Sequence, residues 1–179
     1  MNGSVNYEGR SQHIGDNNFT PLSSLETAIE QVKKSWEGDD QLIDILEDLA
    51  DFINVHPERE VIGLEVKLEK GNRSDLYKRA KELKSKFSRR VAKNQMSATE
   101  QQVYIQVLSF ISTTWFQCIH PKIIAGISSE DLDQIVNDEL IKPVHQAVVR
   151  FDSTVTSETV TGMIYYLTGN CHLVWDSEC

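Results

Sequence analysis

The chain has 179 residues, a net charge of −9 and an isoelectric point near 5.0. This length suits one domain, and the 40% of hydrophobic residues are enough to build one sizeable core. The acidic balance argues against a general coat for nucleic acid or for an anionic membrane, because both need positive charge over a broad surface.

The charge is distributed unevenly along the chain. Residues 67–93 contain 11 of the 18 basic side chains and three acidic ones, so this segment carries +8. The rest of the chain has 7 basic and 24 acidic residues and carries −17, which together with +8 gives the total of −9. The sequence is therefore bipolar, with one basic segment in an otherwise acidic chain.

The N-terminal sequence does not predict a signal peptide, because residues 1–12 contain neither a basic n-region nor an apolar h-region. The three cysteines, an odd number, are expected to be reduced thiols in a cytoplasmic protein. Residues 101–121 have no charged side chain, but their glutamines, serines and threonines make the segment too polar for lipid. We expect a cytoplasmic protein without a membrane span.

Residues 1–19 are rich in Asn and Gly and have no hydrophobic period, which predicts a flexible tail or linker. A short strand around residues 11–14 is the alternative. Ordered structure is predicted over residues 20–179, and its first helix begins with Thr20 as N-cap and Pro21 at the first helical position.

Hydrophobic spacing predicts the helices that follow. The first helix ends at Gly38, and a second one runs over residues 39–53. Residues 60–71 fit either a strand or a helix, and the helical neighbours favour a helix. A basic helix is predicted over residues 74–93.

The next helix covers residues 97–119, and Ser97 and Glu100 have the spacing of a capping box at its start. Apolar residues cover most of its circumference, which is typical of a helix at the centre of a bundle. Pro121 is expected to interrupt it.

Two more helices are predicted after Pro121. The first starts after Ser128, and Pro143 is expected to kink or split it. The last opens at Ser157 and ends at Gly169, which we expect to adopt a positive φ as the C′ residue. Residues 171–175 form a short extended segment. The predicted fold is all-α: one helical domain of about six helices.

No common catalytic motif is present, neither a phosphate-binding glycine loop nor a zinc-protease or hydrolase signature. The only candidate metal ligands are Cys118, His120, Cys171 and His172, and their spacing does not suit zinc. The acidic residues between positions 37 and 51 lack the glycine turn of a calcium loop. We read them as a solvated helix face, which could lie against the basic helix. The sequence predicts no enzyme, no cofactor and no metal.

The basic helix over residues 74–93 admits three readings. It is a solvated face, a dock for an acidic protein partner or for a second copy's acidic helix, or a site for nucleic-acid phosphates. Aromatic residues for stacking bases are scarce in it. The candidate partner-binding residues are its lysines and arginines, Lys78, Arg79, Lys81, Lys86, Arg89 and Arg90.

Several strings resemble a family pattern. The run from Gly162 to Trp175, GMIYYLTGNCHLVW, resembles the C-terminal domains attached to effectors in bacterial ABC-three-component conflict systems. Residues 61–73, with VIGLE, KL and GNR, are similar to an earlier part of that pattern, as is HIGDNN at residues 13–18. The resemblance covers nearly the whole chain, and the LTGNCH run is its most specific element.

The resemblance implies an all-helical module that tethers an effector, or a middle subunit, to an SMC-like or ABC-type ATPase in antiviral defence. It brings no catalytic residues. No effector domain precedes the module here, so we expect a separate subunit or a fragment. The function expected is a non-enzymatic adaptor, and the alternative is an accessory subunit that contacts nucleic acid through residues 74–93. Homo-oligomers are a further expectation.

Overall fold

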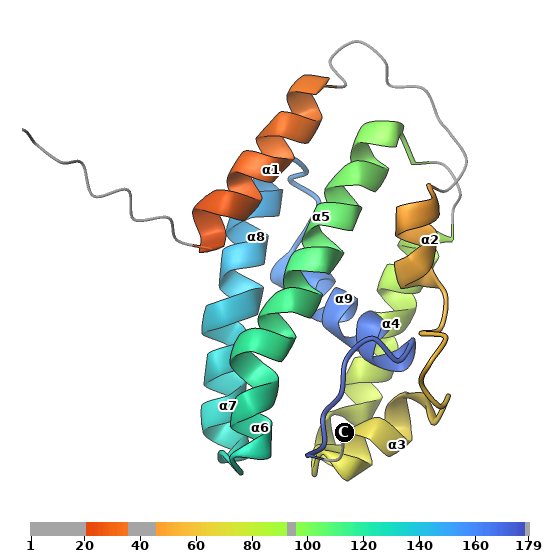
Figure 1. Ribbon diagram of the computed structural model, residues 1–179, viewed down its shortest axis with the longest axis vertical. Helices are drawn as coiled ribbons and strands as arrows, with labels where there is room; N and C mark the ends of the chain where they lie inside the picture. The colour runs from red at the N-terminus through yellow and green to blue at the C-terminus, as the bar shows by residue number, and fades with distance from the viewer. Residues whose placement is uncertain (1–20, 36–45, 93–95, 178–179) are drawn as a thin grey trace, which may run out of the picture.

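The computed structural model describes residues 21–35, 46–92 and 96–177, and within these ranges the regular secondary structure is helical, with no β-strand (Figure 1). Several segments follow one another without a break, so the described residues form seven continuous helices. About six helices were predicted. The elements in chain order are α1 (Pro21–Ser35), α2 (Glu47–Ile53), α3 (Gly63–Lys70), η1 (Ser74–Leu76), α4 (Tyr77–Val91), α5 (Ala98–Thr114), η2 (Trp115–Ile119), α6 (His120–Ile124), α7 (Ser129–Val136), η3 (Asn137–Ile141), α8 (Lys142–Val149) and α9 (Ser157–Gly169). The predicted all-α class is confirmed.

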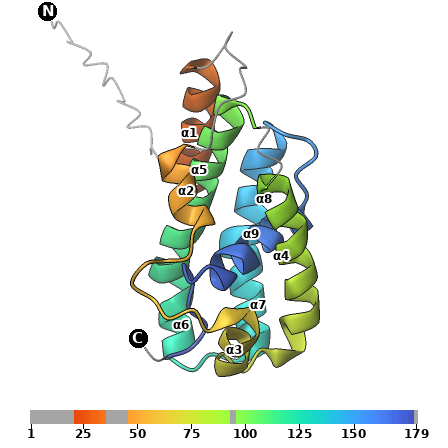
Figure 2. The ribbon, with the colours of Figure 1, turned by 90° about the vertical axis from the view of Figure 1, so that its right-hand side faces the viewer.

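Helices α5 and α9 form the interior of the bundle, and the other helices pack around them (Figures 1 and 2). α4 lies along α9, α1 packs on α5 and α8, α2 packs on α5, and α3 contacts α9 and α4. Every residue from Gly162 to Gly169 is buried. The prediction that residues 97–119 are central also holds, since Val107, Leu108 and Trp115 have no exposed surface.

Pro121 and Pro143 do not break the helices in which they occur, contrary to the expectation for Pro121. Each proline follows a π-helical segment, η2 or η3, in which a backbone N–H bonds to the carbonyl five residues earlier. The His120 N–H bonds to the Trp115 carbonyl in η2, and the Lys142 N–H bonds to the Asn137 carbonyl in η3. The wider turn shifts the hydrogen-bond register by one residue. Each proline therefore enters the first turn of a new α-helix, where no backbone N–H is required.

The helix starts confirm the predicted capping at Ser97, whose hydroxyl accepts a hydrogen bond from the Glu100 N–H at 3.2 Å. Ser128 caps α7 in the same way. α9 begins at Ser157 as expected, and Thr156 before it is the N-cap residue of a capping box with Thr159.

The predicted conformation of Gly169 is wrong. Gly169 is the last residue of α9, and Cys171 adopts the left-handed conformation with φ of 67°. The Cys171 N–H bonds to the Thr168 carbonyl, and the His172 N–H bonds to the Leu167 carbonyl at 2.8 Å. These two bonds are a Schellman motif with cysteine at C′. The Lys84 side chain lies against Gly169, where a Cβ would be 2.1 Å from Lys84 Nζ, and this flexible side chain can move away.

The second predicted helix is shorter in its described part than expected. α2 begins at Glu47, and Leu46 before it is extended, with ψ of 143°. Residues 39–45, the predicted first part of this helix, lie outside the described residues, as do the predicted tail over residues 1–19, Thr20 and Gly38. Within the ambiguous stretch of residues 60–71, Gly63–Lys70 form α3, so the helical reading is confirmed for this part.

Candidate partner-binding face

Helix α4 is held in place by its apolar stripe. Ala80, Leu83, Phe87 and Val91 are all buried, and the helix lies along α9. Gly162 permits this close approach, because a Cβ at that position would lie 2.8 Å from the Leu83 carbonyl oxygen. The rest of the α4 circumference is polar, and the six candidate cations lie on it.

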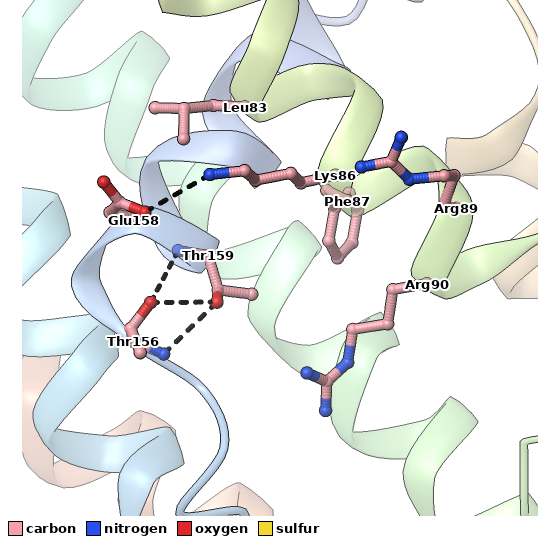
Figure 3. Close-up of a pocket in the computed structure, with 8 residues that line it drawn as sticks. All are labelled: Leu83, Lys86, Phe87, Arg89, Arg90, Thr156, Glu158 and Thr159. Atoms are coloured by element: carbon pink, nitrogen blue, oxygen red, sulfur yellow. Dashed lines mark hydrogen bonds and ion pairs between the residues drawn. The ribbon is translucent and has the colours of Figure 1, made fainter.

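The six predicted cations fall into two rows on α4, because residues three, four, seven or eleven apart share a helix face. Lys78, Lys81 and Arg89 are exposed and form what we call the outer row. Arg79, Lys86 and Arg90 lie at the side of the helix that faces the start of α9 and form the inner row. Figure 3 shows Lys86 and Arg90 of this row. The sequence treated these six residues as one basic surface, and the structure divides them.

The inner row is paired with carboxylates of the same chain. Glu158 at the start of α9 receives both Arg79 and Lys86, the latter at 3.7 Å. Glu82 also pairs with both, at 3.2 and 3.0 Å, and the hydrogen bond and positive charge of Lys86 lower the pKa of its carboxyl group. These four residues are about half exposed, so each pair contributes little to stability.

Arg90 is the most enclosed cation of the inner row. It pairs with Asp152 and hydrogen-bonds to Thr154 Oγ1 at 3.1 Å. Burial opposes ionisation of Asp152, but the hydrogen bonds from Thr154 and the charge of Arg90 hold the pKa of its carboxyl group below the usual value. The Arg90 guanidinium also lies 5.9 Å from the centre of the Tyr104 ring, and burial strongly raises the pKa of the Tyr104 hydroxyl.

In the described part of the chain the outer row has no carboxylate partner of this kind. Within the described residues Lys81 lies over the ring of Tyr77 at 5.9 Å, and neither Lys78 nor Arg89 forms an ion pair. Arg89 borders a groove of about 420 Å³ between α4 and α9 (Figure 3). Leu83 and Phe87 give this groove apolar walls. The arrangement offers exposed positive charge beside apolar surface, which suits the docking of an acidic protein segment.

The acidic residues at positions 37–51 were predicted to form a solvated helix face that could lie against the basic helix. Those that the structure describes, Glu47, Asp48 and Asp51, belong to α2, which packs on α5. Among the described residues, Glu100 lies 4.0 Å from Arg90, and the closer carboxylates that meet the basic helix from outside it are Asp152 and Glu158. The sequence carries no signal for this pairing, because about 60 to 80 residues separate the partners.

The LTGNCH run does not line the partner-binding face but joins three parts of the chain. Thr168 Oγ1 accepts a hydrogen bond from Trp175 Nε1 at 2.9 Å, and the Thr168 carbonyl accepts one from Lys67 Nζ at 2.7 Å. Burial lowers the pKa of the Lys67 amine. Asn170 Nδ2 donates to the Ile53 carbonyl at 2.8 Å. The run therefore ties α3, the segment after α2 and the C-terminal segment to the end of α9.

The candidate metal ligands are not brought together. Cys118 is exposed and Cys171 is buried, and no group of three metal-ligating side chains occurs in the part of the chain that the structure describes. The two histidines meet backbone carbonyls instead: His120 Nε2 lies 3.0 Å from the Asp176 oxygen, and His172 Nε2 lies 2.9 Å from the Asn54 oxygen. Among the described helices none is long and apolar enough to cross a membrane.

Comparison with known proteins gives one match. Residues 63–175 match the model of a family described as C-terminal domain 9 of the ABC-three component (ABC-3C) systems. A search of curated proteins finds no match, and neither does a search of solved structures. The matched range runs from the start of α3 to Trp175, and it includes all of α4 and the LTGNCH run.

Proposed function

The chain belongs to the family of C-terminal domain 9 of the ABC-three component systems, and from this premise we propose that it is a non-enzymatic interaction subunit. In this proposal it bridges an SMC-like or ABC-type ATPase and an effector in antiviral defence, in the cytoplasm. It docks an acidic segment of one of these proteins on the outer row of α4.

The observation that carries the proposal is the division of the cations on α4. Arg79, Lys86 and Arg90 are neutralised within the chain, whereas Lys78, Lys81 and Arg89 project from the same helix without a carboxylate partner among the residues that the structure describes. A helix that only needed solubility would gain nothing from neutralising one row and exposing the other. Complementary charge on a partner would speed and orient docking.

The charge of the remaining chain favours an acidic protein over nucleic acid. Outside residues 67–93 the chain carries −17, which repels phosphates beyond the narrow stripe of α4. An acidic protein segment touches only the stripe. Contact with nucleic acid through α4 is the competing function, and the same experiment separates the two.

The experiment reverses the outer row in the full chain, with Lys78, Lys81 and Arg89 changed to Glu. Exposed ion pairs contribute up to about 1 kcal/mol each, so the loss of three predicts partner binding weakened by about 10- to 100-fold. The readout is co-purification with the proteins encoded by neighbouring genes, followed by titration of the partner that is found. The matched control changes Lys34, Lys122 and Lys142 to Glu, which alters the net charge equally at exposed positions away from α4.

Binding that both variants weaken equally would show a general charge effect and contradict docking on α4. Duplex DNA binding by the wild-type chain would favour the competing function. Three phosphate contacts predict a slope of about −2.7 in log affinity against log salt concentration, and this binding would be lost on reversal of the outer row.

A further inference from the structure

A cleft of about 560 Å³ lies between α2 and α4, and the end of α9 forms its floor (Figure 2). α2 packs on α5 and α4 packs on α9, so the two helices border the cleft from opposite sides. None of the outer-row cations lines it. Apolar side chains of α2 and of the end of α4 line the cleft together with polar side chains of α4 and α9: Ala50, Ile53, Val91, Ala92, Lys84, Ser88, Tyr166 and Asn170.

Lys84 is the one charged residue among the described residues that line this cleft. Its side chain is half-buried, lies against Gly169, and forms no hydrogen bond or ion pair in the described part of the chain. Burial lowers the pKa of its amine, and the opposing effect comes from the Cys171 thiol and not from a carboxylate. A cation that is partly withdrawn from water without an acceptor is costly, so the cleft lacks a counter-charge.

The cations beside Lys84 do not supply this counter-charge but add to the positive potential. Lys67 Nζ donates to the Thr168 carbonyl at 2.7 Å, and Arg59 Nη1 donates to the Cys171 carbonyl at 2.8 Å. Burial lowers the pKa of Lys67, and the charges of Arg59 and Lys84 lower it further. Lys67 and Arg59 therefore already have backbone acceptors at the end of α9, whereas Lys84 has none among the described residues.

The cleft has a polar end and an apolar end. Lys84 and Ser88 are four residues apart on α4, so their side chains share one face of the helix and can donate to the two oxygens of one carboxylate. The polar groups of α9 are engaged elsewhere, since the Asn170 Nδ2 and the Tyr166 hydroxyl both donate to the Ile53 carbonyl. One turn beyond Ser88 the lining of α4 is apolar, and it faces the apolar residues of α2 across the cleft.

We propose that this cleft binds a small organic carboxylate with an apolar body, such as a medium-chain fatty acid. The carboxylate accepts hydrogen bonds from Lys84 and Ser88, and the apolar body lies between α2 and the end of α4. An inorganic anion would leave the apolar walls uncovered, and a neutral apolar molecule would leave Lys84 without a counter-charge. The volume is within the range of about 300–1,000 Å³ that is usual for small-molecule sites. The inference is independent of the bridging function, because the outer row lies outside the cleft.

The first test is calorimetric titration of the full chain with octanoate, octanol and acetate. Octanoate should bind at least about tenfold more tightly than octanol, because only its carboxylate forms charge-assisted hydrogen bonds. It should also bind at least about tenfold more tightly than acetate, which has no apolar chain to bury. Equal affinity for octanoate and octanol, or for octanoate and acetate, would overturn the proposal, as would the absence of octanoate binding.

The second test assigns the site to Lys84. Lys84→Gln should weaken octanoate binding by about tenfold and leave octanol binding unchanged, because it removes the charge of the amine and little of its bulk. The matched control is Lys122→Gln, which removes the same charge from an exposed position on α6 and should bind octanoate as the wild type does. Equal weakening in both variants would show a general charge effect and contradict the site.

The third test uses the wild-type chain, so it does not depend on the folding of a variant. Saturating octanoate should slow acetylation of Lys84 by acetic anhydride at least about fivefold, because a bound carboxylate raises the pKa of the amine and keeps it charged. Mass spectrometry measures the rate at each lysine, and the rate at Lys122 should not change. Unprotected Lys84 in the presence of octanoate would contradict the proposal.

A last variant tests whether the chain supplies the carboxylate itself. Asp39, Asp40 and Asp44 lie outside the described residues, and changing all three to Asn should leave the affinity for octanoate unchanged. Tighter octanoate binding by this variant would show that the chain's own carboxylates compete for Lys84 and would overturn the proposal.

Discussion

Gly162 offers a direct test of how α4 and α9 are held together, because two opposing effects of a Gly162→Ala substitution can be compared. In an ordinary helix interior, alanine in place of glycine stabilises by about 1 kcal/mol. Here the new Cβ would lie 2.8 Å from the Leu83 carbonyl oxygen and 3.4 Å from Phe87 Cβ. The first of these neighbours is backbone, so α4 and α9 must move apart.

Overpacking of a well-packed interior costs about 1–3 kcal/mol, and displacement of backbone lies toward the upper end of this range. Subtracting the gain in helix propensity leaves a net destabilisation of about 1–2 kcal/mol. For a chain of this size the loss corresponds to a melting temperature lowered by about 2–8 °C. The measurement is urea unfolding followed by circular dichroism, in which the midpoint should fall while the m-value stays constant.

Gly169→Ala is the matched control in the same helix. Its Cβ would meet the end of the Lys84 side chain, with Nζ at 2.1 Å, and this flexible chain can turn toward solvent. The expected change in the free energy of unfolding is within about 0.5 kcal/mol. If Gly162→Ala were as stable as the wild type, or if both variants lost equal stability, the argument that Gly162 sets the distance between α4 and α9 would be refuted.

Two further predictions concern buried polar contacts. Arg73 is 2% exposed and forms hydrogen bonds of 2.7 and 2.9 Å to the two carboxylate oxygens of Asp133. Asp133→Asn would leave the buried cation with only Asp75, 3.8 Å away, as a carboxylate among the described residues, and should cost about 2–3 kcal/mol in urea unfolding. Burial lowers the pKa of His172, so the unfolded chain binds the proton more readily, and the free energy of unfolding should fall as the pH drops below about 6.5. In His172→Gln part of this pH dependence should be absent, and an unchanged pH profile would contradict the assignment.

Much of the fold could be predicted because the patterns involved are local. The apolar stripe of α4, with Ala80, Leu83, Phe87 and Val91, repeats at helical spacing and is buried as expected. The cap at Ser97 depends on residues three apart, so its spacing in the sequence was sufficient. α3 was ambiguous in isolation, and the helical character of its neighbours gave the correct answer.

The errors arose where a local rule has a less common alternative. Proline removes a hydrogen bond from a regular α-helix, which is why Pro121 was expected to interrupt the chain. A preceding π turn avoids this cost, and no pattern at residues 115–119 announces such a turn. Glycine is the usual residue with positive φ at a helix end, so Gly169 was predicted to adopt this conformation. Cys171 takes that conformation instead, and Gly169 remains in the helix with the Lys84 side chain against it.

The division of the cations on α4 could have been partly foreseen. Helical spacing alone separates Lys78, Lys81 and Arg89 from Arg79, Lys86 and Arg90, because the two sets lie on different sides of one helix. The sequence could not tell which row is neutralised. Asp152 and Glu158 reach α4 only through the tertiary packing of α9 and the segment before it.

The most specific run of the sequence is therefore a structural element rather than a partner site. Thr168, Gly169 and Cys171 are buried, and the hydrogen bonds of the run join α3, the segment after α2 and the C-terminal segment. A partner at the surface cannot contact these groups, so the run carries information about the fold and none about which protein binds. Under the proposed function, partner choice must rest on exposed residues, above all the outer row of α4. Reversal of the outer row should accordingly change binding without changing the free energy of unfolding by more than about 0.5 kcal/mol, whereas Gly162→Ala should lower the urea midpoint and leave the outer row intact.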